Sequence, residues 1–170
     1  MKRQRRCGAA LWACLAAAAL QPLQPLRASD AVATRYPDGA ASFQTNCVVC
    51  HGQNGGGTPS LAPPLTSYPA RYIATAAGRS QLAMTVLYGM FGDIVVEQKH
   101  YNFKMPDFAK LDDDALAAVL NYVVFELAHA NPDSSPLSAA DIAAARSQPA
   151  LADAVRQHRA ALLIALGLAN

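Results

Sequence analysis

Five consecutive residues have the types and spacing to hold a cofactor: Cys47, Val48, Val49, Cys50 and His51. A C-x-x-C-H run is the attachment signature of a c-type haem. Residues three and four positions apart lie on one face of a helix, so Cys47 would share a face with Cys50 and His51. That face offers two thiols for the haem vinyl groups and one imidazole for the iron. The sequence therefore predicts one haem c, attached covalently to Cys47 and Cys50, with His51 as an axial iron ligand.

Two other kinds of site also use paired cysteines. A structural zinc site needs further Cys or His ligands at zinc spacing, and the chain has no second C-x-x-C. A thioredoxin-like redox pair follows a strand within a βαβ pattern, whereas the residues before Cys47 have a helical pattern. Both alternatives fit less well than haem attachment. A single motif also indicates a single haem.

The segment 1–28 has the organisation of a secretory signal peptide, with basic residues at positions 2–6, an apolar stretch over 7–20 and small residues after it. We expect cleavage after Ala28, with cleavage after Ala33 as the alternative. The apolar stretch of 14 residues is shorter than the roughly 20 residues of a spanning helix, which makes an uncleaved anchor the second interpretation. Export to the periplasm is the expected location.

Removal of the signal peptide changes the charge of the chain. Five of its 14 basic residues and none of its 12 acidic residues lie in 1–28, so the mature chain has a net charge of −3. A nucleic-acid partner therefore has no electrostatic support. Cys7 and Cys14 leave as well, so the mature chain keeps only the two thiols of the haem motif.

The remaining sequence is mainly helical. Asp38, Ser80 and Asp112 are helix-capping residues by type and position, while Gly89 and the pair Asn131-Pro132 end helices. Glycine and proline make 54–64 a loop. The predicted elements are a helix over 38–50, short helices over 69–77 and 80–88, a hairpin of 94–96 with 99–101, and a long helix from the Asp112 cap to about residue 130.

The segment 38–130 resembles the class I cytochromes c. Gly39 and Phe43 lie eight and four residues before Cys47, where this family packs its first helix against its last. Val119 and Tyr122 fall where the last helix supplies its half of that contact. The resemblance implies an all-α fold, a small cytochrome c fold around one covalent haem, here followed by a helical extension over 137–170.

The resemblance also implies how the iron is held. Residues 62–65 match the proline loop of the family, so a carbonyl there, Pro63 before Pro64, should accept a hydrogen bond from His51. Residues 101–106 match the distal ligand loop, which makes Met105 the second axial ligand. The alternatives are Met90, in a turn near the pocket, and His100, in the hairpin. Met84 lies in an apolar helical run and is expected in the core.

A haem pocket also needs apolar walls and partners for the propionates. The mature chain has no Trp, so Tyr101, with Tyr72 second, is the expected propionate donor. The residues expected to enclose the ring are Phe43, Leu65, Ile73, Leu82, Val86, Phe91, Phe108, Leu116, Val119 and Val123.

A His/Met ligand pair raises the reduction potential relative to bis-His ligation, and a six-coordinate iron leaves no open position for a substrate. The predicted function is an exported monohaem electron carrier, or the cytochrome subunit of a larger dehydrogenase, reductase or oxidase system. Its partners would be a redox donor and acceptor, or sibling subunits of a membrane-associated oxidoreductase. It would not be an enzyme by itself. A peroxidase-like enzyme or gas sensor with an open haem site is the second class, and a thiol oxidoreductase the third.

The extension 137–170 has three interpretations. Ser138 and Asp141 indicate the start of one helix, Pro149 separates it from another, and 160–168 is apolar on nearly every side. The extension could fold back onto the haem domain or dock on a redox partner or sibling subunit. A membrane-surface role is the third interpretation, although the segment lacks the basic face that favours it.

Overall fold

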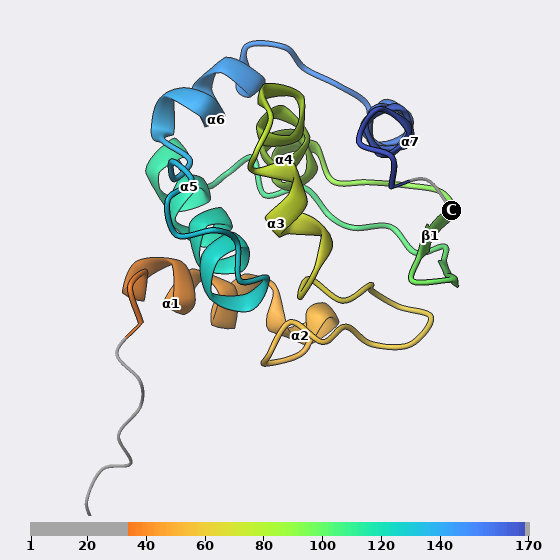
Figure 1. The fold of residues 1–170 in the computed structure, drawn as a ribbon, viewed down its shortest axis with the longest axis horizontal. Helices are drawn as coiled ribbons and strands as arrows, with labels where there is room; N and C mark the ends of the chain where they lie inside the picture. The colour runs from red at the N-terminus through yellow and green to blue at the C-terminus, as the bar shows by residue number, and fades with distance from the viewer. Residues whose placement is uncertain (1–33, 169–170) are drawn as a thin grey trace, which may run out of the picture. The chain divides into compact units, whose positions relative to one another are not determined.

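The computed structural model describes residues 34–168, which belong to one compact unit (Figure 1). The expected signal peptide and both expected cleavage sites lie outside the described residues. The structure confirms the helical class, with one small antiparallel sheet. Its elements are α1 (Pro37–Asn46), α2 (Val48–His51), α3 (Tyr68–Tyr72), α4 (Ala76–Tyr88), β1 (Ile94–Val96), β2 (Lys99–Tyr101), α5 (Asp113–Asn121), the π-helical turn η1 (Tyr122–Leu127), α6 (Ala139–Arg146) and α7 (Ala152–Ala165). Within the described residues, no helix is long and apolar enough to cross a membrane.

The first helix packs across the last helix of the haem domain, as the family resemblance predicts. Gly39 lies so close to the carbonyl of Ala118 that a Cβ at this position would overlap it. One turn later the Phe43 ring is fully buried, with its centroid 5.5 Å from that of Tyr122. Val119 completes this cluster. The small residue lets the backbones approach and the aromatic residue fills the space beside them.

The predicted helix over 38–50 is interrupted in the structure. α1 ends at Asn46, Cys47 has φ −118°, and the short α2 follows. The backbone hydrogen bonds nevertheless continue on both sides, because Cys47 donates to Phe43 and His51 donates to Cys47, each at 2.9 Å. The expected cap at Asp38 is also wrong. Tyr36 precedes the helix, and Asp38 lies in its first turn, where a carboxylate is favourable to the helix dipole.

The two helices that lead into the pocket also begin at different residues from those predicted. α3 spans Tyr68–Tyr72 rather than 69–77. α4 begins after Thr75, whose hydroxyl accepts a hydrogen bond from the Gly78 amide at 3.1 Å, rather than after Ser80. Because an earlier residue with the same capping chemistry starts the helix, α4 is longer than predicted. Its end at Gly89 is confirmed.

The last helix of the haem domain begins where predicted and ends earlier. Asp112 caps it, accepting a hydrogen bond from the Ala115 amide at 2.7 Å. Beyond Asn121 the helix widens into η1, in which the Ala128 amide donates to the Val123 carbonyl, and it ends at Leu127 rather than at 130. His129 has φ +53°, a left-handed conformation that no α-helix continues through. The chain therefore leaves the helix before Asn131-Pro132 is reached.

The position of the hairpin is confirmed, and the structure gives its register. Ile94 pairs with Tyr101, Val95 with His100 and Val96 with Lys99. The two residues between the strands both have positive φ, as a tight two-residue hairpin turn requires.

The extension folds back onto the haem domain. α6 packs against α4 and α5, and α7 packs against α4 (Figure 1). Ile142 of α6 and Leu162 and Leu163 of α7 are buried in the same core cluster as Leu87 and Leu116. Six apolar residues of the extension are therefore buried, whereas Leu151 and Ile164 stay 76% and 70% exposed.

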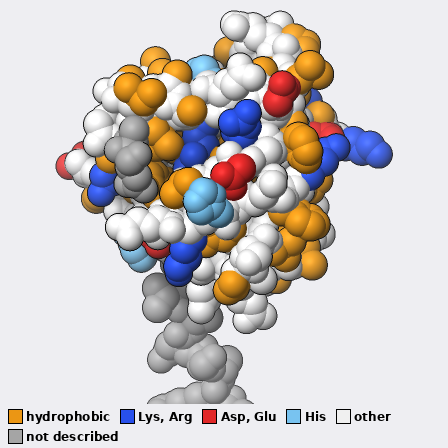
Figure 2. Space-filling model, turned by 90° about the vertical axis from the view of Figure 1, so that its right-hand side faces the viewer, with side chains coloured by type: hydrophobic (Ala, Val, Ile, Leu, Met, Phe, Trp, Pro, Cys, Tyr) orange, Lys and Arg blue, Asp and Glu red, His pale blue; other side chains and the backbone are white. Residues whose placement is uncertain are grey.

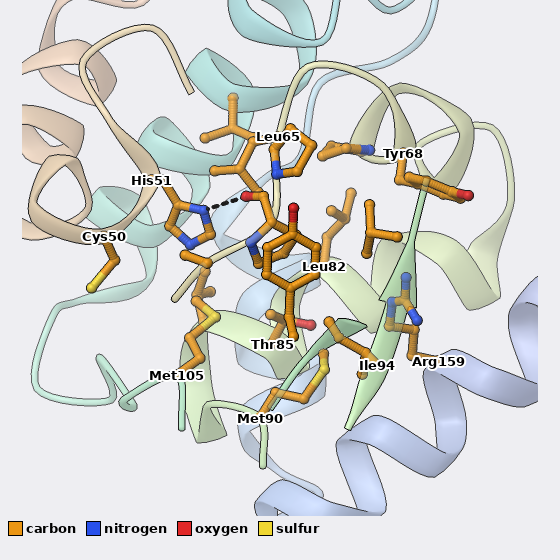
Figure 3. Close-up of a pocket in the computed structure, with 18 of the residues that line it drawn as sticks. Cys50, His51, Leu65, Tyr68, Leu82, Thr85, Met90, Ile94, Met105 and Arg159 are labelled. Atoms are coloured by element: carbon orange, nitrogen blue, oxygen red, sulfur yellow. Dashed lines mark hydrogen bonds between the residues drawn. The ribbon is translucent and has the colours of Figure 1, made fainter. Parts of the chain in front are cut away.

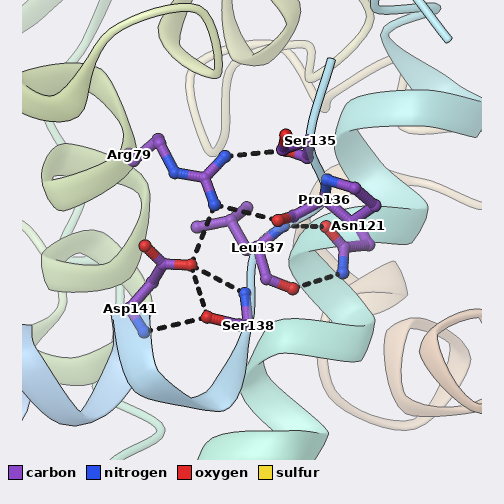
Figure 4. Close-up of polar contacts among 7 residues, drawn as sticks. All are labelled: Arg79, Asn121, Ser135, Pro136, Leu137, Ser138 and Asp141. Carbon is purple, nitrogen blue, oxygen red and sulfur yellow. Dashed lines mark hydrogen bonds and ion pairs between the residues drawn. The ribbon is translucent and has the colours of Figure 1, made fainter. Parts of the chain in front are cut away.

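Polar contacts fix the start of the extension (Figure 4). The Arg79 guanidinium donates to the carbonyls of Ser135 and Pro136 and pairs with Asp141 at 2.8 Å. The buried Asn121 amide exchanges two hydrogen bonds with the Leu137 backbone, at 2.8 and 2.9 Å. The predicted start of α6 is confirmed, since Ser138 and Asp141 form a capping box.

Candidate haem site

A deep apolar pocket lies between α2, the proline loop, α3, α4, the hairpin and the segment around Met105 (Figure 3). Its empty space is about 1150 Å³, part of which is open solvent. His51, Cys50 and Met105 all line it. The pocket brings together three of the four residues that the sequence singled out.

His51 is held in an orientation that suits a metal ligand. Its side chain is buried, and Nδ1 lies 2.9 Å from the Pro63 carbonyl oxygen. A carbonyl can only accept, so Nδ1 carries the proton and Nε2 keeps its lone pair. Burial lowers the pKa of His51, against the opposing effect of the Pro63 hydrogen bond, and thus favours the neutral imidazole. Pro63, rather than Pro64, is the partner, as expected.

The two cysteines of the motif are not paired in a disulfide, and Cys50 directly precedes His51. Cys50 lines the pocket, and Cys47 is half-buried beside the Phe43 cluster. Burial, together with the neighbouring Cys50, raises the pKa of Cys47 to about 11. Reactive redox cysteines have lowered pKa values. This environment is therefore unsuited to a thiol oxidoreductase.

Two methionines reach the pocket from neighbouring backbone segments. Met90 and Met105 form an isolated antiparallel bridge, with N···O distances of 3.2 and 2.9 Å, and both side chains point into the pocket (Figure 3). Gly89 has φ +69° and lies against the Met105–Pro106 backbone. A Cβ at position 89 would overlap that backbone, so the close approach needs a glycine. Met90 therefore remains a candidate axial ligand, as an alternative to Met105.

The other two candidates lie elsewhere. His100 is on the exposed side of the hairpin, where Nδ1 pairs with Asp93 at 2.9 Å. Met84 packs against the main core cluster. Neither lines the pocket.

The predicted apolar wall is only partly correct. Leu65, Leu82, Val86 and Val123 line the pocket. Five of the other predicted residues are wholly or partly buried in the core clusters but do not line the pocket, namely Phe43, Ile73, Phe108, Leu116 and Val119. Phe91 is wrong, because its side chain is 55% exposed. The hairpin residues Ile94 and Val96 take part instead, which a periodicity argument cannot find because the hairpin's position depends on the tertiary fold.

One end of the pocket is polar. Both expected propionate donors, Tyr72 and Tyr101, line the pocket. Arg159 of α7 joins them (Figure 3), although the sequence analysis treated the extension separately and missed it. A signal did exist, because Arg159 shares the buried face of α7 with Val155, Leu162 and Leu163. A basic residue within an apolar helical stripe calls for an explanation.

The residues present fit a haem c. The pocket offers an apolar cavity, a buried neutral imidazole whose Nδ1 is already hydrogen-bonded, two thiols beside it, thioether sulfurs and a polar end. The Tyr72 hydroxyl is buried at that end without a hydrogen-bond partner among the described residues. Such an orphaned group indicates a ligand with a polar edge.

Comparisons with known proteins agree with this geometry. Residues 36–124 match the family model described as Cytochrome c. The chain is 41% identical over 92 residues to one cytochrome c-552 of Thermus thermophilus and 43% identical over 86 residues to another from the same organism. These matches cover 54% and 51% of this chain and 62% and 65% of the relatives, so the chain spans somewhat less than two thirds of their length. The chain belongs to the cytochrome c family, whose members carry electrons on covalently bound haem c.

Proposed function

We propose that this protein carries single electrons on one haem c that is attached to Cys47 and Cys50, with His51 and Met105 as the axial ligands. The observation that carries the proposal is the buried His51 imidazole, fixed by the Pro63 carbonyl at 2.9 Å and facing an apolar pocket lined by Cys50 and Met105. No other grouping of residues in the described chain combines these donors.

Each residue has a defined role in this site. Pro63 fixes the His51 tautomer and ring orientation, as hydrogen-bond partners of ligating histidines generally do. Met105 supplies a thioether, which favours the ferrous state relative to a second histidine. The haem supplies the one-electron chemistry when bound. The surrounding apolar side chains exclude water and so raise the cost of the more highly charged ferric state.

Occupation of both axial positions favours a carrier over an enzyme or gas sensor. A catalytic or sensing haem needs an open position for its ligand, and here a second methionine, Met90, also lies at the pocket. The protein would thus exchange electrons with a donor and an acceptor without transforming a substrate.

The proposed location is the periplasm, supported by the signal-peptide pattern of 1–28. Apolar side chains beside the site, Val49 at 82% and Phe103 at 60% exposure, offer contacts for redox partners. Figure 2 shows one face of the molecule, on which Lys and Arg side chains lie close to Asp and Glu side chains with hydrophobic side chains around them. A freely exchanging carrier is the proposed form. Membership of a membrane-associated oxidoreductase as its cytochrome subunit is the second form.

The mass of the protein tests the attachment. Under denaturing conditions, protein from cells with a working cytochrome maturation system should carry the mass of one haem, and both thiols should resist alkylation. A variant with Cys47→Ala and Cys50→Ala is the control and should have a haem-free mass. A haem-free mass and two alkylated thiols in the unmodified chain would refute the proposal and favour thiol chemistry.

Met105→Ala tests the second ligand. The variant should keep its haem, lose the sulfur-to-iron absorption band of the ferric protein, acquire a lower reduction potential and bind carbon monoxide in the ferrous state. Met84→Ala is the matched control, because Met84 packs in the core and should change none of these. A six-coordinate Met105→Ala protein with an unchanged potential would assign the ligand to Met90. Carbon monoxide binding by the unmodified ferrous protein would instead support the open-site class.

A further inference from the structure

Arg159 is a buried cation without an anionic partner. Its side chain is 8% exposed, and it forms no ion pair with a carboxylate of the described residues. No Asp or Glu of the described residues lines the haem pocket, and Asp93, in the groove beside α7, pairs with His100 instead. Burial of a charge is costly unless an opposite charge or several hydrogen bonds compensate for it. The site therefore lacks an anion.

The existing contacts of Arg159 fix its position but leave most of its N–H donors without an acceptor among the described residues. Nη2 donates a long hydrogen bond of 3.3 Å to the Val95 carbonyl, and the guanidinium lies over the Tyr68 ring at 5.9 Å from its centroid. A guanidinium carries five N–H donors, so most of them remain for another group. Both contacts fix its direction toward the pocket, where Figure 3 shows it.

Tyr72 provides a second observation that points to the same missing group. Its side chain is 6% exposed and lines the pocket, and its hydroxyl has no partner among the described residues. Burial raises the pKa of Tyr72, while the positive charge of Arg159 and a donor of its guanidinium near the Tyr72 oxygen oppose that rise. Two buried donors, one of them charged, therefore lie at one end of the pocket. Within the described chain, the Tyr72 hydroxyl has no partner there, and Arg159 has only the long hydrogen bond to Val95.

The position of Arg159 and Tyr72 in the pocket indicates which anion they would bind. In a haem, the edge that carries the two vinyl groups lies opposite the edge that carries the two propionates. Cys50, which would bond a vinyl group, and Arg159 lie on opposite sides of the pocket (Figure 3). A haem anchored at the cysteines would thus extend its carboxylates toward Arg159 and Tyr72.

We propose that the C-terminal extension completes the haem site: Arg159 of α7, with the Tyr72 hydroxyl, binds a haem propionate and raises the reduction potential. The proposal rests on the haem attachment proposed above. It gives the extension a function beyond covering the core.

The rest of α7 keeps Arg159 in place. Val155, Leu162 and Leu163 bury the face on which Arg159 lies. Arg156, three residues earlier in the same helix, packs against Gly92 beside the hairpin. These contacts hold α7 in place without a propionate, so the Arg159 side chain loses little conformational freedom when it binds one.

The direction of the effect follows from charge. A cation at the propionate edge offsets the carboxylate charge, which otherwise stabilises ferric iron. Removal of Arg159 should therefore favour the ferric state. A tenfold change in the equilibrium constant of a one-electron couple corresponds to about 59 mV, and we expect a shift of about this size.

The experiment compares four variants of the full-length holoprotein: Arg159→Gln, Arg159→Lys, Tyr72→Phe and, as the control, Arg146→Gln. Arg146 joins α6 to the haem domain through Asp113 and two backbone carbonyls but does not line the pocket. Its loss should weaken packing of the extension without touching the propionate end. The readouts are the midpoint potential, the propionate bands in the resonance Raman spectrum, and the unfolding temperature.

We expect Arg159→Gln to disfavour reduction about tenfold and to move a propionate band. Arg159→Lys should shift the potential less, because it keeps the charge and loses the planar fork. Tyr72→Phe should move the same band with a smaller potential shift, and it tests the proposal even if Arg159→Gln does not fold, because it keeps the ring. Arg146→Gln should lower only the unfolding temperature.

Two results would overturn the inference. One is a haem-containing Arg159→Gln or Tyr72→Phe protein with an unchanged potential and unchanged propionate bands, which would leave the electron-carrier proposal intact. The other is an equal potential shift in Arg146→Gln, which would assign the effect to general loosening. A haem-free unmodified protein would instead refute the proposed function itself.

Discussion

Truncation of Phe43 should remove the main contact between the first and last helices of the haem domain. The ring is 0% exposed, lies 5.5 Å from the Tyr122 ring and packs against Val119 and Val123. Replacement of a buried Phe by Ala costs about 3–5 kcal/mol, and the aromatic pair adds about 0.5–1.5 kcal/mol beyond its buried area. Single domains have a total stability of about 5–15 kcal/mol, so Phe43→Ala should use up a large share of it.

The assay is thermal unfolding of the holoprotein followed by circular dichroism. At about 4 °C per kcal/mol for a chain of this size, a total loss of about 3.5–6.5 kcal/mol should make Phe43→Ala unfold about 14–26 °C earlier. The haem spectrum of the folded protein should stay native, because Phe43 does not line the pocket. Phe91→Ala is the matched control, since the same truncation at a 55% exposed ring should change stability by only about 0.5 kcal/mol. Equal unfolding temperatures for the two variants would refute the proposed helix contact.

Three further changes test other parts of the fold by thermal unfolding. Gly39→Ala should destabilise the protein by about 1–3 kcal/mol, because its Cβ would meet the Ala118 carbonyl; an unchanged unfolding temperature would show that the two helices can separate at no cost. Asp141→Asn should cost about 1 kcal/mol at pH 7, since burial alone would raise the pKa of Asp141 but the hydrogen bonds from Arg79 and Ser138 lower it. Because the folded-state pKa of Asp141 is lowered, its charged form stabilises the native state at pH values above the ordinary carboxyl pKa. This stabilisation is lost as the pH falls through the folded-state pKa, so the unfolding temperatures of the variant and the unmodified protein should converge as the pH falls below about 4. A constant difference between the two down to about pH 2 would contradict this. Deletion of 137–170 uncovers apolar residues of α4 and α5 and should leave little folded protein at physiological temperature, whereas an equally stable truncated cytochrome would mean that the packing of α6 and α7 contributes nothing.

The chemistry of the site was readable in the sequence because it depends on residues close together in the chain. The C-x-x-C-H run sets the positions of its thiols and imidazole within two turns of helix. The hairpin segments and the caps of α5 and α6 follow from local chemistry in the same way, whereas the Pro63 partner follows from the family resemblance. Family membership follows from these motifs together with the spacing of Gly39 and Phe43.

Tertiary structure decided which side chains surround the pocket. Phe91 and Ile94 are both apolar and lie three residues apart, yet the first is exposed and the second lines the site. Their local sequence does not separate them, because the hairpin's placement beside α7 depends on the tertiary fold. The break at Cys47 and the π-helical turn after Asn121 likewise leave no clear mark in periodicity.

The role of the extension shows the same division most clearly. The sequence by itself determined that residues 137–170 form two helices, because Ser138 and Pro149 act on their immediate neighbours. It left open whether those helices meet the haem domain, a partner or a membrane. Only the fold brings Arg159 to a pocket whose histidine, His51, lies more than 100 residues earlier in the chain, because contacts at that separation depend on the burial of whole helix faces and not on any local preference.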